Sequence, residues 1–292
     1  YYSVQDFSTL PEFIQVWPGH GAGSACGKAL GAVPSSTVGY EKIRNWAFQY
    51  EEDKEGFIKY LLEGQPEPPK YFAMMKKLNK VERPLLTEVP KHKKLSKDEF
   101  LKAYNSGVKV IDTRSKVDFA EGFIPKSINI QGNNSFSTWM GWLVNYSEPF
   151  ILVANEDQME DITRKLMRIG MDQMMGYVDD MKSMGLNLQT ADVIDIGEFK
   201  TYLNREDVQV IDVRNKTEYE ATHIENSENV FVGTLEDNFD KISRDKKIVI
   251  HCQSGDRSAI AYSLLKKNGF ENVKNFSGGM KEWMENDNLV TK

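Results

Sequence analysis

Short apolar runs alternate with helix-like segments over most of residues 100–292. The runs are rich in Val and Ile, which is typical of strands buried on both faces, and they lie at residues 108–111, 150–153, 208–213 and 248–251. Residues 157–169 and 256–268 show helical spacing, and Gly170 and Gly269 stand where each helix should end. Strands alternating with helices predict parallel sheets with helices on both faces.

This pattern occurs twice along the chain. Residues 108–114 (VKVIDTR) match residues 208–214 (VQVIDVR), and the match continues 100 positions apart through Lys116/Lys216, Ile124/Ile224, Ser127/Ser227 and Asn129/Asn229. We therefore expect two copies of one α/β domain, at residues 91–190 and 191–292. The first 90 residues differ, with a Gly-rich stretch at 18–31, a helical region at 40–62 and a linker at 83–94.

The loop after the strand at 248–251 has the composition of a nucleophilic site. It contains, in order, Cys252, Gln253, Ser254, Gly255, Asp256 and Arg257, and Ser258 follows in the helix. A loop that enters a helix amino terminus presents backbone N–H donors and a partial positive charge, so it should favour the thiolate form of Cys252. Gly255 permits a tight turn, and the guanidinium fork of Arg257 should bind an anionic group of the substrate. A buried structural cysteine is the alternative, and the spacing of Gly255 and Arg257 after Cys252 favours the nucleophile.

These residues resemble the active loop and flanking motifs of rhodaneses. The further matches are residues 210–214, Glu218 with His223, and residues 276–279 with Trp283. The resemblance implies that Cys252 takes up a sulfane sulfur as a persulfide and passes it to a thiol or to sulfite. It also implies that Asp212 and Arg214 form a salt bridge behind the loop and that His223 is structural. The loop has six residues, one fewer than in related phosphatases, which disfavours a phosphatase.

The first copy lacks this chemistry. Alignment of the helix ends places Val153 opposite Cys252, and a one-residue shift in the strand places Ala154 there instead. No Gly-x-Arg follows, and Glu156 and Asp157 would repel an anion at the helix start. We expect the first copy to be an inactive rhodanese fold that acts as a spacer or docking surface. For Trp139 and Trp142, core packing is favoured over docking.

The amino-terminal segment contains Pro18-Gly19-His20, Cys26-Gly27-Lys28 and residues 34–48 in an order that resembles a metallo-β-lactamase-fold protein. The similarity is to the carboxyl-terminal part of the αββα domain of a persulfide dioxygenase fused to rhodanese domains, as in bacterial sulfide detoxification. It implies that His20 lies behind the ligands of a mononuclear non-haem iron and that Cys26 lies near the dioxygenase pocket. The His-x-His-x-Asp-His motif of that family is missing. The chain begins at Tyr1 without Met, and whether it is a fragment stays open; we expect mononuclear iron only if an amino-terminal dioxygenase region is present.

Composition narrows the function classes. The net charge of −6 does not indicate a nucleic-acid surface, and the basic run at 91–94 is interpreted as a solvated linker. No apolar stretch has the ~20 residues of a membrane helix, and no signal peptide is evident. With only two cysteines, Cys26 and Cys252, placed in different domains, a disulfide framework is excluded and a reducing, cytoplasmic location is expected.

The leading hypothesis is a thiol sulfurtransferase that needs no cofactor in its rhodanese domain. Its expected partners are thiol persulfides, thiosulfate and sulfite, and neither a nucleic acid nor a membrane; a homo-oligomer stays open. The alternative is a tandem rhodanese interaction platform, or a persulfide or redox sensor, in which Cys252 does not turn over. An assay for multiple turnovers separates the two hypotheses.

Overall fold

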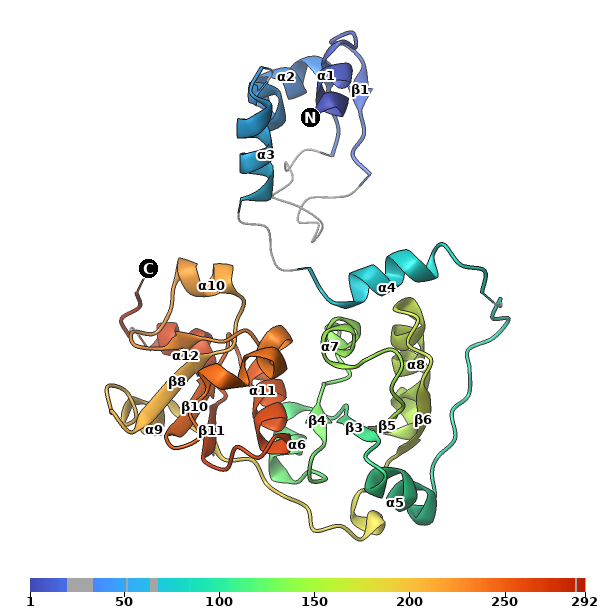
Figure 1. Ribbon diagram of the computed structural model, residues 1–292, viewed down its shortest axis with the longest axis vertical. Helices are drawn as coiled ribbons and strands as arrows, with labels where there is room; N and C mark the ends of the chain where they lie inside the picture. Colours follow the sequence, from blue (N-terminus) through green and yellow to red (C-terminus); the bar gives the residue numbers. More distant parts are fainter. Residues whose placement is uncertain (20–33, 51, 64–67, 84, 287, 292) are drawn as a thin grey trace. The chain divides into compact units, whose positions relative to one another are not determined.

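A computed structural model describes residues 1–19, 34–50, 52–63, 68–83, 85–286 and 288–291. The chain divides into two compact units, Tyr1–Glu67 and Pro68–Lys292 (Figure 1). The second unit contains both copies of the predicted α/β domain. His20 and Cys26 lie outside the described residues, so the places expected for them in a dioxygenase pocket stay predictions.

The first unit combines short helices with one small antiparallel sheet. Strand β1 (Gln15–Val16) pairs with β2 (Ser36–Thr37), and the helices are α1 (Tyr2–Ser8), α2 (Val38–Arg44), the 3-10 helix η1 (Trp46–Tyr50) and α3 (Lys54–Leu62). The helical region expected at 40–62 is therefore present. Packed rings hold η1 against α3, with the Trp46 and Tyr60 centroids 4.6 Å apart.

The first copy forms a four-stranded parallel sheet in the order β4-β3-β5-β6. Its strands are β3 (Lys109–Asp112), β4 (Ile128–Asn129), β5 (Phe150–Val153) and β6 (Met174–Val178). Its helices are α5 (Lys97–Asn105), α6 (Lys116–Glu121), α7 (Phe136–Leu143), η2 (Glu156–Gln158), α8 (Met159–Arg168) and η3 (Lys182–Met184), and α4 (Tyr71–Leu78) precedes this copy in the chain. Every residue of β5 is buried, as the apolar run predicts.

The second copy forms a five-stranded parallel sheet in the order β7-β11-β10-β8-β9. Its strands are β7 (Val193–Ile194), β8 (Val208–Asp212), β9 (Glu228–Asn229), β10 (Lys247–His251) and β11 (Val273–Phe276). Its helices are α9 (Ile196–Lys200), α10 (Lys216–Ala221), η4 (Val232–Lys241), α11 (Asp256–Lys267) and α12 (Gly279–Glu285). Gly170 and Gly269 follow α8 and α11 with φ of +63° and +80°, the left-handed geometry that ends a helix.

The two copies pack directly against each other within the second unit. Trp142 of α7 is buried and meets the ring of Phe231 edge-on, with centroids 5.3 Å apart, and Trp139 contacts the same ring at 6.2 Å. Trp142 therefore lies in the core at the junction of the copies, and the partly buried Trp139 packs against that core. Helix α4, which the sequence did not predict, adds Tyr71 against Gly141, where a Cβ would lie 2.3 Å from the Tyr71 ring.

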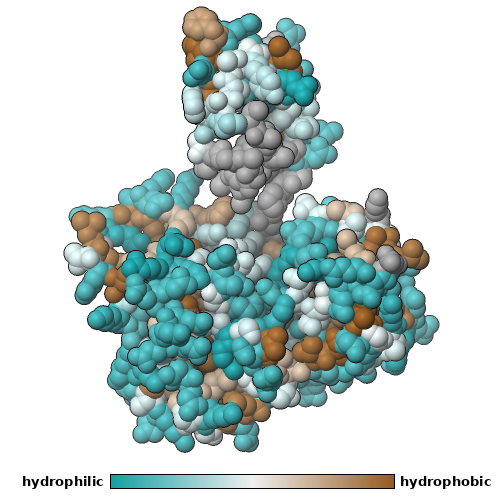
Figure 2. All heavy atoms as spheres, turned by 180° about the vertical axis from the view of Figure 1, so that it is seen from behind, coloured by the Kyte–Doolittle hydropathy of each residue, from teal (hydrophilic) through white to brown (hydrophobic). Residues whose placement is uncertain are grey.

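The surface of the described residues is mostly polar (Figure 2). Figure 2 shows polar residues over most of the visible face, with apolar side chains in small groups. Among the residues that the structure describes, no helix is long and apolar enough to cross a bilayer.

A buried hydrogen bond also joins the copies, and its removal should weaken the second unit. The Ser263 hydroxyl in α11 accepts from the backbone N–H of Asn129 in β4 at 3.0 Å. Ser263→Ala leaves this N–H without its acceptor, so we expect the free energy of unfolding to fall by ~1–3 kcal/mol. Urea unfolding monitored by tryptophan fluorescence measures the change, and an unaltered midpoint would contradict the role of this bond.

Candidate active site

The loop that joins β10 to α11 encloses the thiol of Cys252. The Gly255 N–H donates to Cys252 Sγ at 3.1 Å, and Ser258 Oγ lies 3.7 Å from the sulfur. The loop can close in this way because Gly255 adopts a φ of +95°, which disfavours any residue with a side chain. Cys252 is only 1% exposed, so the sulfur lies at the base of the loop, next to the start of α11.

The segment after β11 supports the loop from behind. The backbone N–H groups of Met280 and Lys281 in α12 donate to the carbonyl oxygens of Cys252 and Gln253, each at 2.9 Å. Gly279 allows this approach, because a Cβ there would lie 2.4 Å from the Cys252 carbonyl oxygen. Two loop carbonyls are thus bound by α12, while the Gly255 N–H faces the sulfur.

Asp212 and Arg214 form a buried ion pair at the end of β8. Arg214 Nη2 lies 2.7 Å from Asp212 Oδ2 and donates to the Thr222 carbonyl at 2.6 Å. The first copy repeats the arrangement with Asp112 and Arg114, whose corresponding atoms lie 2.6 Å apart. The first copy has this ion pair although it has no cysteine at the end of the neighbouring strand. The pair therefore stabilises the turn after the strand and is not specific to a site with a nucleophile.

Arg257 departs from the sequence-based expectation of an arginine fork free to bind the substrate. Its Nη1 and Nη2 contact Glu218 Oε2 and Oε1 at 2.5 and 2.8 Å, so one carboxylate takes both arms of the fork. Burial alone would lower the pKa of Arg257, but the hydrogen bond and charge of Glu218 raise it. Burial opposes ionisation of Glu218 as well, yet Arg257 holds the pKa of that carboxyl below its ordinary value. The pair thus joins α10 to the start of α11.

Two histidines of the second copy, His223 and His251, pack against aromatic rings. His223 stacks on Tyr219 with ring centroids 4.0 Å apart, and its Nδ1 lies 3.0 Å from the Tyr219 carbonyl oxygen. His251, next to Cys252, is fully buried against Phe199, and neither ring nitrogen has a hydrogen-bond partner among the described residues. Burial lowers the pKa of His251, which favours the neutral ring.

Strand register resolves which residue of the first copy stands opposite Cys252. Asp112 aligns with Val153, as Asp212 aligns with His251. Ala154 therefore occupies the position of Cys252, and the alternative of Val153 is wrong because the helix is offset by one residue relative to the strand. Ala154 is buried, and the exposed Glu156 opens the 3-10 helix that follows.

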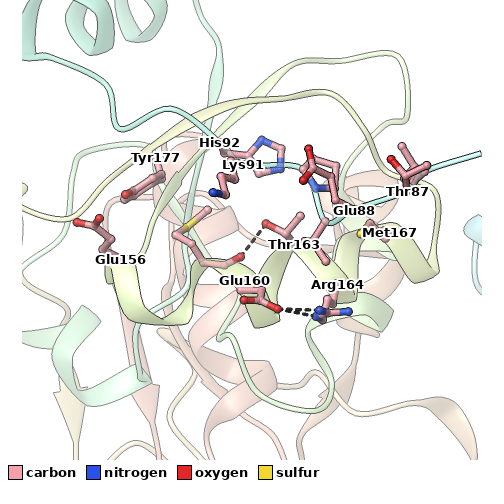
Figure 3. Close-up of a pocket in the computed structure, with 14 residues that line it drawn as sticks. Thr87, Glu88, Lys91, His92, Glu156, Glu160, Thr163, Arg164, Met167 and Tyr177 are labelled. Atoms are coloured by element: carbon pink, nitrogen blue, oxygen red, sulfur yellow. Dashed lines mark hydrogen bonds and ion pairs between the residues drawn. The ribbon is translucent and has the colours of Figure 1, made fainter.

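The described residues do not fit the iron of a dioxygenase. No group of three or more His, Cys, Asp or Glu side chains among them is placed to bind a metal. A pocket of about 770 Å³ lies instead in the first copy, between α8 and residues 86–92 (Figure 3). Its polar groups include an ion pair between Glu160 and Arg164, and none of its lining residues belongs to the loop from Cys252 to Arg257. The pocket is thus separate from the Cys252 loop.

The fold and the loop together define a sulfurtransferase-type domain, and the sequence comparison agrees. The Rhodanese-like domain family matches residues 96–184 and 195–286, which is more than half of the chain. The chain belongs to the rhodanese-like family.

Two relatives and one solved structure show which individual proteins the chain resembles. It is similar to the uncharacterized protein YqhL of Bacillus subtilis, with 37% identity over 26% of this chain and 60% of that protein. It is also 36% identical, over 27% of this chain and 42% of the relative, to YrkF of the same organism, which is named as a candidate sulfur carrier protein. A crystal structure described as a metallo-beta-lactamase from Staphylococcus aureus is 39% identical, with a TM-score of 0.50 over 60% of this chain and 48% of that one. The chain spans less than two thirds of the length of each relative. These findings confirm the expected fold class.

The Glu218–Arg257 pair should contribute to stability. The side chains of Glu218 and Arg257 are 31% and 18% exposed, so water only partly screens their interaction. We therefore expect Glu218→Gln to lower the free energy of unfolding by ~1–3 kcal/mol at neutral pH. Because the pKa of Glu218 is lowered in the folded state, this contribution is present above its ordinary value of 4.5 and is lost as pH falls through the lowered pKa. Denaturant titrations of both proteins measure the effect. Glu220→Gln, in the exposed pair with Lys216, is the control and should change stability little; equal effects of the two substitutions would contradict the assignment.

His251 should make the protein sensitive to mild acid. The unfolded chain protonates this imidazole near its ordinary pKa of 6.5, while burial in the folded state lowers the pKa of the ring. Stability is therefore fully present above pH 6.5 and should fall by up to ~1.4 kcal/mol per pH unit below it. His251→Asn removes the titrating group, so its unfolding free energy should depend less steeply on pH between 6.5 and about 5.5. Identical slopes for the two proteins would show that His251 is protonated in the folded state.

Proposed function

We propose that the second copy is a sulfurtransferase and that Cys252 is its nucleophile. The observation that carries the proposal is the Cys252 sulfur at the base of a six-residue loop, where it accepts a hydrogen bond from Gly255. A backbone donor and the start of α11 stabilise negative charge on sulfur, whether in a thiolate or in a persulfide. Membership of the rhodanese-like family and the similarity to YrkF support this proposal.

The reaction has two balanced steps. The Cys252 thiolate attacks the outer sulfur of thiosulfate or of a thiol persulfide, an S–S bond forms to Cys252, and sulfite or the thiolate leaves with the electron pair of the bond that breaks. Sulfite or a second thiol then attacks the outer sulfur of the Cys252 persulfide and restores the thiolate. No cofactor takes part. Gly255 and Ser258 contact the reacting sulfur, whereas Arg257, Asp212 and Arg214 hold the surrounding turns.

We infer a coupling to persulfide oxidation in a polypeptide that also contains a complete dioxygenase domain. Such a domain produces sulfite, which is one of the two acceptors proposed for the Cys252 persulfide. The similarity to the Staphylococcus aureus metallo-beta-lactamase structure supports this arrangement. The iron and its ligands belong to that domain, and the reducing cytoplasm suits a nucleophile that must stay a free thiol.

Cys252→Ser should abolish sulfur transfer and preserve the fold. The change is nearly isosteric, but a serine hydroxyl neither ionises near neutral pH nor forms a persulfide, so we expect a loss of at least ~1000-fold. The rate of thiocyanate formation from thiosulfate and cyanide, and of thiosulfate formation from persulfide and sulfite, measures the loss. Mass spectrometry of wild-type protein after donor treatment should show one added sulfur on the Cys252 peptide.

The same assays test the alternative functions. A wild-type protein that takes up one sulfur and does not turn over would be a sensor or an interaction platform. A folded Cys252→Ser protein with wild-type rates would contradict the role of the thiol.

A further inference from the structure

A lysine of the inactive first copy reaches the active loop of the second. Helix α6 begins at Lys116, whose ammonium group donates to the Ser254 carbonyl and to Asp256 Oδ1, the latter at 2.9 Å. Gly255 makes this approach possible, because a Cβ there would lie 2.9 Å from Lys116 Nζ. The loop around Cys252 is therefore completed by a side chain that lies more than 130 residues earlier in the sequence.

Two further side chains of the first copy converge on the same aspartate. Asn133 Nδ2 lies 3.4 Å from Asp256 Oδ2, and Gln131 Nε2 lies 3.4 Å from the Asp256 carbonyl oxygen. Asp256 is the first residue of α11, only four positions from the nucleophile. An unbalanced carboxylate at this place would repel both a thiolate and an anionic donor.

The other cations near the loop are already balanced. Arg257 is bound by Glu218, and Arg214 is bound by Asp212, at distances of 2.5 to 2.8 Å. Neither guanidinium therefore compensates Asp256, and among the residues that the structure describes the ion pair of Asp256 is with Lys116.

We propose that Lys116 is a specificity-determining residue of the Cys252 site. By neutralising Asp256, it lets the loop accept small anionic sulfur compounds such as thiosulfate and sulfite, so the inactive copy completes the active site. This inference rests on the proposed function for its substrate class, but its test needs no sulfur transfer.

The repeat provides a matched control. Lys216 occupies the same position in the second copy, at the first residue of α10, and is 80% exposed beside Glu220. Lys116 is 30% exposed beside Asp256. The two substitutions Lys116→Gln and Lys216→Gln therefore remove the same charge from equivalent helix positions, one at the active loop and one away from it.

The experiment compares alkylation of Cys252 by iodoacetate, an anion, and iodoacetamide, its neutral analogue. Peptide mapping separates Cys252 from Cys26. Lys116→Gln should lower the iodoacetate/iodoacetamide rate ratio by roughly three- to fivefold, as expected for one charge acting across a partly exposed site. The rate with iodoacetamide should stay within about twofold, which reports that the loop is intact, and the difference between the proteins should shrink at high salt. Lys116→Gln combined with Asp256→Asn should restore the wild-type ratio, and Lys216→Gln should leave it unchanged.

Three outcomes would overturn the inference. These are unchanged rates with both reagents in Lys116→Gln, an equal fall in both rates, which would indicate a purely structural contact, and an equal change of the ratio in Lys216→Gln. A protein that shows the expected ratios yet performs no sulfur transfer would refute the proposed function and leave the electrostatic role of Lys116 in place.

Discussion

An ion pair at the end of one strand, β8 in the second copy and β3 in the first, constrains the rest of each rhodanese-like domain. Removing two charges from water is costly, so the buried pair of Asp212 and Arg214 is stable only if each of its polar groups has a hydrogen-bond partner. Arg214 meets this demand with contacts to both carboxylate oxygens and to the Thr222 carbonyl, while its own backbone N–H donates to Asp212. The pair thereby fixes the turn after β8, and β10, which lies beside β8 in the sheet, delivers Cys252 next to that turn.

The first copy shows that this constraint is independent of catalysis. Asp112 and Arg114 form the same pair, and β5 lies beside β3 in the same register. What differs is the turn that follows. A 3-10 helix with exposed acidic residues after Ala154 replaces the left-handed turn at Gly255, so no backbone donor is gathered around a sulfur atom. The same fold thus forms without the nucleophilic loop, and the first copy contacts the second through Asn129 and Trp142.

The sequence predicted features that depend on neighbours in the chain. Buried strands, helix ends at Gly170 and Gly269, and the loop from Cys252 to Arg257 all follow from local composition and spacing. Features that depend on distant partners were missed. Glu218 reaches Arg257 across 39 positions, and Lys116 reaches Asp256 across 140. Lys116 and Lys216 were matched in the repeat, but only the packing of the two copies distinguishes their surroundings. Helix α4 also escaped prediction, because it lacks a side-chain cap and is stabilised by contacts such as Tyr71 on Gly141.

The pairing of the cations changes how the site must hold an anion. A free guanidinium fork would recognise a sulfonate by charge and shape, but Glu218 occupies the fork of Arg257. The attraction has to come from backbone dipoles, which are fixed in direction and need no reorganisation when charge moves between donor and sulfur. In the resting state the Gly255 N–H already donates to the sulfur of Cys252. Such a site suits a reaction in which negative charge passes from a thiolate to a persulfide and back, because the same donor stabilises both forms. Under the proposed function, the pairing of Asp256 with Lys116 removes a repulsive charge from the loop, and the fixed Gly255 N–H remains to stabilise negative charge on the sulfur of Cys252.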